Sequence, residues 1–416
     1  MGSVRVLGAV VGAVVVMATS GSLLRTLVMP GGRAGRLIKA VDRATDRVFR
    51  TVCLPFRNFE QRNRILVFEA PLILATLLGC WLAAYLLGFA LLLWPATGSL
   101  AASLRESGSS LLTLGFASTH GGGPTTVDFL AGATGLIVVA LQIAYLPTLY
   151  NAFNRRETEV TLIGVRAGLP AWGPELLARS RFTITTADLP EFYRQWERWA
   201  AEVAESHSSY PILLRFRSPQ PMASWLISLL AVMDSAALYS ALSPGQTPLQ
   251  ARLCLAMGFR CLQQLATTLG IPFDPDPRPD DPIALTREEF DQGIARLESV
   301  GFAMERSPDE AWPHFQGWRV NYESIAYRLA RAIDVVPAAW SGPRRSGEAP
   351  ISPRRVVNRT PENPEGEAPP TRVTTGRCIG NRPPWTGSRL PWTVIRQGSI
   401  EPKLRSIVTA TSGRTT

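Results

Sequence analysis

Three long stretches with almost no charge dominate the first 155 residues of the chain. Each stretch carries at most two charged residues and otherwise consists mainly of apolar and small side chains. A helix needs about 20 residues to cross a hydrocarbon core that is ~30 Å thick. The pattern therefore predicts three transmembrane helices, at residues 4–28, 65–94 and 127–153.

The first stretch also fits a cleavable signal peptide, with Arg5 before the apolar run and Ala18-Thr19-Ser20 as a small-residue cleavage site. The next loop argues against cleavage, because residues 25–64 hold ten basic and three acidic residues. Cleavage would leave this basic loop outside, contrary to the positive-inside rule. We therefore expect residues 1–28 to form an uncleaved transmembrane helix whose N-terminus is outside.

This orientation of the first helix determines the rest of the topology. The second helix runs outward, residues 95–126 lie outside, and the third helix returns to Arg155 and Arg156 at its cytoplasmic end. The outer segment carries few charges, in contrast to the basic inner loop, as the positive-inside rule requires. The sequence thus predicts a multi-pass protein of the cell membrane with its C-terminal part in the cytoplasm.

The basic linker, residues 29–64, contains apolar side chains at helical spacing between its cations. A basic amphipathic helix of this kind lies on the anionic inner leaflet. The alternative is a solvated helix that packs on the cytoplasmic domain. The apolar positions are Leu37, Val41, Ala44, Val48 and Val52.

A short segment between the second and third helices has the composition of a re-entrant loop. Residues 98–112 allow about three helical turns but are too short and too polar to span. A compact turn, a glycine run and Pro124 follow before the third helix. Non-helical backbone at membrane depth is tolerated only where it lines a water-filled cavity or is buried in protein. The alternative is an ordinary extracellular hairpin.

The order of helix, short helix, turn and helix over residues 65–153 resembles the pore domain of potassium channels. In that family the filter has the sequence Thr-Val-Gly-Tyr-Gly, and its carbonyl oxygens replace the hydration shell of the ion. The resemblance implies a filter in which Thr113 supplies a hydroxyl and a carbonyl and the Phe116 ring packs behind the turn. The corresponding residues here are Thr113, Leu114, Gly115, Phe116 and Ala117.

Two positions depart from the family pattern. Ala117 stands where the family has its second glycine, and Ser118 stands where it has an aspartate. If the backbone at Ala117 needs a positive φ, alanine costs about 1 kcal/mol or more. These departures bear on potassium selectivity and on conduction itself.

The resemblance implies a homotetramer, because one pore loop per chain needs four chains to close a filter. It also implies a gate on the third helix, where Gly132 and Gly135 form a flexible point and Pro147 removes a backbone hydrogen bond. The predicted function is a cation channel that conducts potassium or another monovalent cation. The alternative is a non-conducting membrane-anchored sensor or scaffold that retains this architecture.

Residues 154–340 are predicted to form a mostly α-helical cytoplasmic domain. The segment Met222–Leu242 is apolar enough to span a membrane, but Asp234 in its middle favours a buried core helix. Two short strands are expected at residues 159–165 and 211–216. Helices are expected at residues 188–207, 221–242, 248–270, 286–300 and 321–333.

Residues 341–416 are predicted to be a disordered basic tail, because they contain few large aliphatic residues and many Pro, Gly, Arg, Ser and Thr. The tail would be attracted weakly to anionic lipids of the inner leaflet. The fold class expected overall is an α-helical membrane protein with three transmembrane helices, a re-entrant pore loop, a helical cytoplasmic domain and this tail.

The net charge of +10 would suggest a nucleic-acid partner in a soluble protein. Here many of the basic residues flank apolar stretches, so membrane lipids, monovalent cations and further copies of the chain are the expected partners, and no nucleic acid is expected.

Catalytic motifs of the GxSxG, HExxH and P-loop types do not occur, so we expect no enzyme, no cofactor and no metal site. His207 is expected at a helix end. The cysteines are scattered and suggest neither disulfides nor zinc: Cys53, Cys80, Cys254, Cys261 and Cys378.

Overall fold

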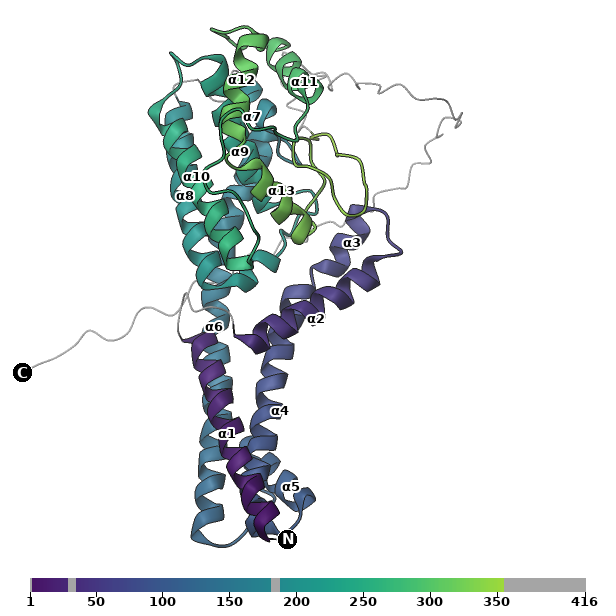
Figure 1. Cartoon of the computed structure of the whole chain (residues 1–416), viewed down its shortest axis with the longest axis vertical. Helices are drawn as coiled ribbons and strands as arrows, with labels where there is room; N and C mark the ends of the chain where they lie inside the picture. Colours follow the sequence, from purple (N-terminus) through teal and green to yellow (C-terminus); the bar gives the residue numbers. More distant parts are fainter. Residues whose placement is uncertain (1, 29–34, 181–187, 355–416) are drawn as a thin grey trace, which may run out of the picture. The chain divides into compact units, whose positions relative to one another are not determined.

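The structure is a computed structural model, and it describes residues 2–28, 35–180 and 188–354 (Figure 1). Over these residues the regular structure is helical, and the only β-type pairing is a pair of isolated bridges. Four of the described helices are long and apolar enough to cross a membrane. These properties are those of an α-helical membrane protein.

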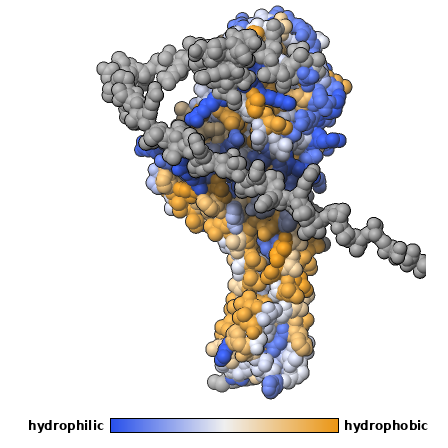
Figure 2. Space-filling model, turned by 180° about the vertical axis from the view of Figure 1, so that it is seen from behind, coloured by the Kyte–Doolittle hydropathy of each residue, from blue (hydrophilic) through white to orange (hydrophobic). Residues whose placement is uncertain are grey.

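Three apolar helices pack side by side: α1 (Gly2–Leu27), α4 (Glu69–Thr97) and α6 (Gly122–Ala167) (Figure 1). Helices α1 and α4 contact each other through glycines. A Cβ on Gly12 would lie only 2.5 Å from the carbonyl oxygen of Gly88, so α1 and α4 approach closely at this point. Figure 2 shows a largely apolar surface over these helices, which is the surface that a bilayer would cover.

Helix α6 is longer than the predicted third transmembrane helix and continues through Pro147 to Ala167. The strand expected at residues 159–165 is therefore wrong. Its β-branched residues suggested a strand, but Val160, Ile163 and Ala167 are buried at helical spacing against the domain that follows. The burial of one face of the helix outweighed the weak preference of the β-branched residues for a strand.

The basic linker forms two helices, α2 (Arg36–Cys53) and α3 (Phe59–Leu66). On α2, Val41 and Phe49 are buried, whereas the predicted apolar residues Ala44, Val48 and Val52 are exposed. Contacts within the chain thus bury Val41 and Phe49, and the predicted contact of the other apolar residues with the inner leaflet stays a prediction.

The rest of the described chain is a bundle of helices around a large apolar core. All five helices predicted in this region are present within a few residues of their expected bounds. The bundle also contains two helices that were not predicted, α7 and α12. Its elements are α7 (Gly173–Ser180), α8 (Leu189–Ser209), the 3₁₀ helix η2 (Pro211–Arg215), α9 (Trp225–Leu242), α10 (Leu249–Leu269), α11 (Arg287–Glu298), α12 (Pro308–Arg319) and α13 (Glu323–Ala332).

The strand expected at residues 211–216 is also wrong, because η2 occupies this segment. Pro211 begins η2, a position where the missing N–H of proline costs nothing and its fixed φ fits a helical turn. The chain therefore turns tightly between α8 and the segment that leads to α9.

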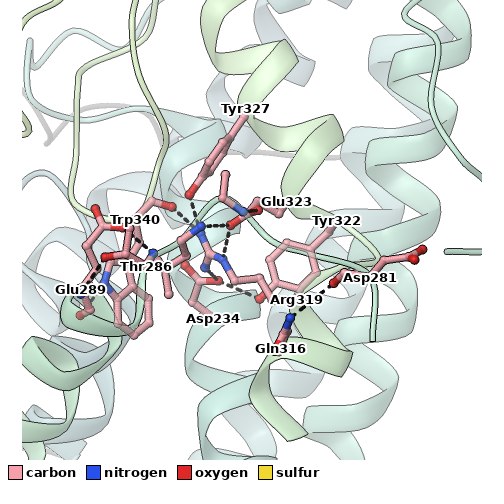
Figure 3. Close-up of polar contacts among 12 residues, drawn as sticks. Asp234, Asp281, Thr286, Glu289, Gln316, Arg319, Tyr322, Glu323, Tyr327 and Trp340 are labelled. Atoms are coloured by element: carbon pink, nitrogen blue, oxygen red, sulfur yellow. Dashed lines mark hydrogen bonds and ion pairs between the residues drawn. The ribbon is translucent and has the colours of Figure 1, made fainter. Parts of the chain in front are cut away.

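Helix α9 is buried along its whole length inside the bundle. The charge of Asp234 is compensated by Arg319 of α12, which also donates to Glu323 at 2.8 Å and to the Tyr327 hydroxyl at 3.0 Å (Figure 3). Tyr322 donates to Asp234 at 2.7 Å. This agrees with the prediction that the segment is a core helix, and the network of buried hydrogen bonds explains how its carboxylate is tolerated.

The first part of the predicted tail packs against the bundle, so a boundary at residue 341 is wrong. Arg344 is 4% exposed and donates to the carbonyl oxygens of Val335 and Val336, each at 2.9 Å. Glu348 forms an ion pair with Arg62 of α3 at 3.2 Å. The remainder of the predicted disordered tail, residues 355–416, lies outside the described residues.

Candidate functional site

The short helix expected within residues 98–112 is present as α5 (Leu100–Leu111), which packs between α4 and α6. Ser99 caps its start by accepting a hydrogen bond from the amide of Ala102 at 3.2 Å. Ser107 donates to the Leu86 carbonyl of α4 at 2.9 Å. On the other side, a Cβ on Gly135 of α6 would lie 1.9 Å from the Leu111 carbonyl oxygen. The end of α5 is thereby fixed against both long helices.

The turn that follows α5 is tied to a single serine of that helix. The backbone carbonyl of Ser109 accepts from the amide of Leu114 at 2.8 Å and from that of Gly115 at 3.3 Å. The Ser109 hydroxyl oxygen accepts from the amides of Phe116 at 2.9 Å and Ala117 at 3.0 Å. Four consecutive amide groups of the turn thus converge on one residue.

The carbonyl oxygens of the same peptide groups accept no such hydrogen bonds from the described part of the chain. Among the described residues, no donor reaches the carbonyl oxygens of Thr113, Leu114, Gly115 or Phe116, and all four residues are exposed. Carbonyl oxygens without a donor from the protein can coordinate a cation, since carbonyl dipoles can replace water around an ion.

Along the turn, residues with a positive φ alternate with residues without one. Thr113 has a φ of +55° and Gly115 a φ of +72°, both in the left-handed region. Glycine adopts this conformation freely, but it is unusual for a β-branched residue such as threonine. Ala117 does not have a positive φ. The cost considered for alanine at this position does not arise, and the strained residue is Thr113 instead.

Two carboxylates hold the flanks of the turn. Glu106 of α5 is 3% exposed and accepts hydrogen bonds from the amide, at 2.7 Å, and the hydroxyl of Thr119. Asp128 of α6 accepts from the Ser110 hydroxyl at 2.7 Å. The first contact ties the segment after the turn to α5, and the second joins the end of α5 to α6, so the conformation of the turn does not depend on its own residues alone.

The Phe116 ring does not pack behind the turn within one chain, as the resemblance implied. It is 55% exposed, and the Arg105 guanidinium lies 5.5 Å from its centroid. This distance permits a cation–π contact. Within a single chain, the ring is therefore available for contact with another molecule.

The predicted gating residues lie on α6 and have different surroundings. Gly132 and Gly135 face the end of α5, where a Cβ on Gly132 would lie 3.3 Å from the Ser110 carbonyl oxygen. Pro147 lies inside the continuous helix. The two glycines have a packing role at the turn, and the helix is not interrupted at any of the three positions.

A second buried polar cluster lies where α6 enters the bundle. Arg156 of α6 contacts the ring Nε2 of His207 at 3.0 Å and donates to the carbonyl oxygens of Leu213 at 2.9 Å and Phe216 at 2.8 Å. His207 lies in the last turn of α8, as expected, and it is completely buried. Burial, together with the nearby Arg156, holds the pKa of His207 well below its usual value. The imidazole is neutral at pH 7 and accepts from Arg156.

The sequence prediction named the turn but missed Ser109 and Glu106, which hold it. The available signal was the density of small polar residues on α5, at positions that a transmembrane hairpin would otherwise fill with apolar side chains. Within the described ranges no group of three or more His, Cys, Asp or Glu residues could hold a metal ion.

Comparison with protein-family models, with curated proteins and with solved structures yields no match for this chain. The site must therefore be interpreted from its own geometry.

Proposed function

We propose that the chain is one subunit of a tetrameric membrane channel for potassium or another monovalent cation, with the turn Thr113–Ala117 as its filter. The observation that supports this proposal most strongly is the run of four exposed residues, 113–116, whose carbonyl oxygens accept no hydrogen bond from a described residue. Because Ser109 binds the amide groups of the turn, the carbonyl groups are held ready for an ion without reorganisation.

Four chains are needed because one chain presents only one such turn. The turn residues and the Phe116 ring are exposed in a single chain. Arranged around a common axis, four turns would enclose an ion by carbonyl oxygens on all sides, as in potassium-selective filters. The short helix α5 would then support each turn from behind.

The proposed membrane placement follows the charge pattern. Helices α1, α4 and α6 span the membrane, with the N-terminus and the α5 turn outside. The basic helix α2 and the bundle lie in the cytoplasm, in accordance with the positive-inside rule.

The test is ion flux through purified protein in liposomes, under a potassium gradient with sodium as the comparison. Replacement of Gly115 by aspartate places a carboxylate in the proposed filter and strains a residue with a φ of +72°. We expect Gly115→Asp to reduce potassium flux to the level of protein-free liposomes.

The matched control is Gly122→Asp at the start of α6, which adds the same charge seven residues later along the chain. No atom lies within 4 Å of a Cβ at Gly122, and a carboxylate is favourable at a helix N-terminus. This variant should conduct. Flux that survives Gly115→Asp would show the filter assignment to be wrong. Absence of flux from the unmodified chain over a range of pH and voltage would favour the non-conducting sensor.

A further inference from the structure

A cavity of about 610 Å³ lies between the three apolar helices and the bundle. Its walls come from the end of α1, the start of α2, the first half of α4, α6, the end of α8, η2 and the end of α10. Pockets of roughly 300–1,000 Å³ hold small organic ligands. The cavity is therefore large enough for a ligand, and it is separate from the proposed filter turn.

One side of the cavity is strongly basic. Arg25 of α1 and Lys39 and Arg43 of α2 line it, and none of them forms an ion pair with a described residue. Asp42 also lines the cavity, but it is paired with Arg215 at 3.3 Å. The three unpaired cations leave this side complementary to an anion.

Another part of the lining is apolar and comes from the long apolar helix α4. Ile73, Leu77 and Trp81 of α4 form this wall. The cavity thus joins a cationic part to an apolar part, as an amphiphilic ligand requires.

Two buried polar atoms that line the cavity lack partners. Gln142 of α6 is 9% exposed, and its Oε1 atom has no hydrogen-bond partner in the described part of the chain. The hydroxyl of Ser208, at the end of α8, is buried too and finds no partner among the residues that the structure describes. Buried polar groups are normally hydrogen-bonded, so two such atoms beside one cavity indicate a missing polar ligand.

We propose that this cavity binds the headgroup and upper acyl chain of an anionic phospholipid from the cytoplasmic leaflet. Arg25, Lys39 and Arg43 bind the phosphate, and Gln142 and Ser208 bind polar atoms of the headgroup or glycerol. The acyl chain lies against the wall around Trp81. The inference requires the proposed membrane placement, but it does not require that the protein conducts ions.

Charge and position favour a lipid over a free anion. The cations lie at the end of the spans where the basic linker begins, and basic pockets between helices on the cytoplasmic side bind anionic lipid headgroups. A free phosphate would use the cations but would leave the apolar wall uncovered. The shared chemistry is phosphate recognition, and an experiment can distinguish the two sources.

The experiment is titration calorimetry of the full chain in a neutral detergent with dioctanoyl-phosphatidylglycerol. Dioctanoyl-phosphatidylcholine and inorganic phosphate are the comparison ligands. The cavity variant is Arg25→Gln/Lys39→Gln/Arg43→Gln. Its matched control is Arg47→Gln/Arg57→Gln/Arg64→Gln, which removes the same charge from exposed residues that do not line the cavity.

We expect saturable binding of the phosphatidylglycerol that weakens about 100-fold in the cavity variant, because each cation near an anionic lipid contributes close to a fivefold change in affinity. The control variant should bind within about threefold of the unmodified chain. Equal weakening in both variants would overturn the proposal in favour of general surface charge. Binding of inorganic phosphate with equal affinity, or of phosphatidylcholine with equal affinity, would overturn it as well.

A second variant, Gln142→Leu, separates binding from folding. Removal of an unpaired buried polar group should leave the melting temperature of the lipid-free protein unchanged or raise it. The rise in melting temperature on adding the phosphatidylglycerol should become smaller. A lower melting temperature without lipid, combined with an unchanged lipid effect, would assign Gln142 a purely structural role and remove it from the proposed site.

Discussion

At the scale of single residues, Ser109 determines the geometry of the proposed filter more than the turn residues do. Its two oxygen atoms accept hydrogen bonds from four consecutive amide groups. The sequence pattern predicted which residues form the turn, because glycine and the flanking helices are local features. It did not predict Ser109, because a serine on a polar helix has no distinguishing local pattern, and only the folded turn brings the amides to it.

Replacement of Ser109 by alanine should alter conduction without unfolding the protein. The substitution removes the acceptor of the Phe116 and Ala117 amides and leaves the backbone acceptor of Leu114 and Gly115 in place. The second half of the turn then loses its support, and we expect the potassium-to-sodium flux ratio to fall. Ser109→Thr keeps the hydroxyl and should preserve the ratio. An unchanged ratio in Ser109→Ala would exclude this role.

A second residue-scale prediction concerns His207 and pH. Its pKa in the folded protein lies well below the value of about 6.5 expected in the unfolded chain. As the pH falls below 6.5, the unfolded chain therefore binds a proton that the folded protein does not. Stability should decrease toward acid, by at most about 1.4 kcal/mol per pH unit from this group.

The measurement is the melting temperature between pH 7.5 and 5, compared between the unmodified protein and His207→Gln. Glutamine can still accept from Arg156 but does not titrate, so its stability should depend less on pH in this range. Parallel curves for the two proteins would mean that His207 takes up its proton in the folded state as well.

At the scale of elements, the helix pattern could be predicted wherever a helix has a long periodic or uniformly apolar sequence. The helix predicted at residues 286–300 is present as α11, which begins with a capping box of Thr286 and Glu289. Helix α12 was missed although Ser307 and Glu310 form the same motif, because Pro313 within it argues against a helix. The position of the buried face of α2 could not be predicted either, because it depends on contacts with distant segments such as η2.

The contact between α5 and α6 gives an element-scale prediction. A Cβ on Gly135 would overlap the Leu111 carbonyl oxygen, so Gly135→Ala must push the two helices apart. Overpacking of this kind costs about 1–3 kcal/mol. The melting temperature in detergent should fall, and the turn held by α5 should be displaced, with loss of selective flux.

Gly79→Ala on α4 is the matched control for this change. Gly79 is exposed, and no atom lies within 4 Å of its Cβ position. Alanine favours a helix interior over glycine by about 1 kcal/mol, so the control should be neutral or stabilising. If both variants change the melting temperature alike, the α5–α6 contact does not have the proposed importance.

At the scale of the whole molecule, η2 connects the membrane helices to the bundle. Arg215 of η2 forms ion pairs with Glu69 of α4 at 2.8 Å and Asp46 of α2 at 3.1 Å. Arg156 of α6 donates to carbonyl oxygens at residues 213 and 216, within and just after η2. Through these contacts η2 is bonded to α2, α4 and α6, so it is one element through which a movement of the bundle would displace all three helices, as a gate controlled from the bundle would need.

The strength of this connection can be measured with a double-mutant cycle on Arg215 and Glu69. Arg215→Met leaves the buried Glu69 without its nearest cation, and breaking a buried ion pair in this way costs about 3–5 kcal/mol. Glu69→Gln removes the unpaired charge, so the double variant should be more stable than the sum of the single losses predicts, by about 0.5–3 kcal/mol.

The control is Arg194→Met on the exposed face of α8. It removes a surface ion pair with Glu191 and should cost at most about 1 kcal/mol. Additive losses at Arg215 and Glu69 would mean that the two residues act independently, and η2 would then not connect α4 to the bundle through this pair.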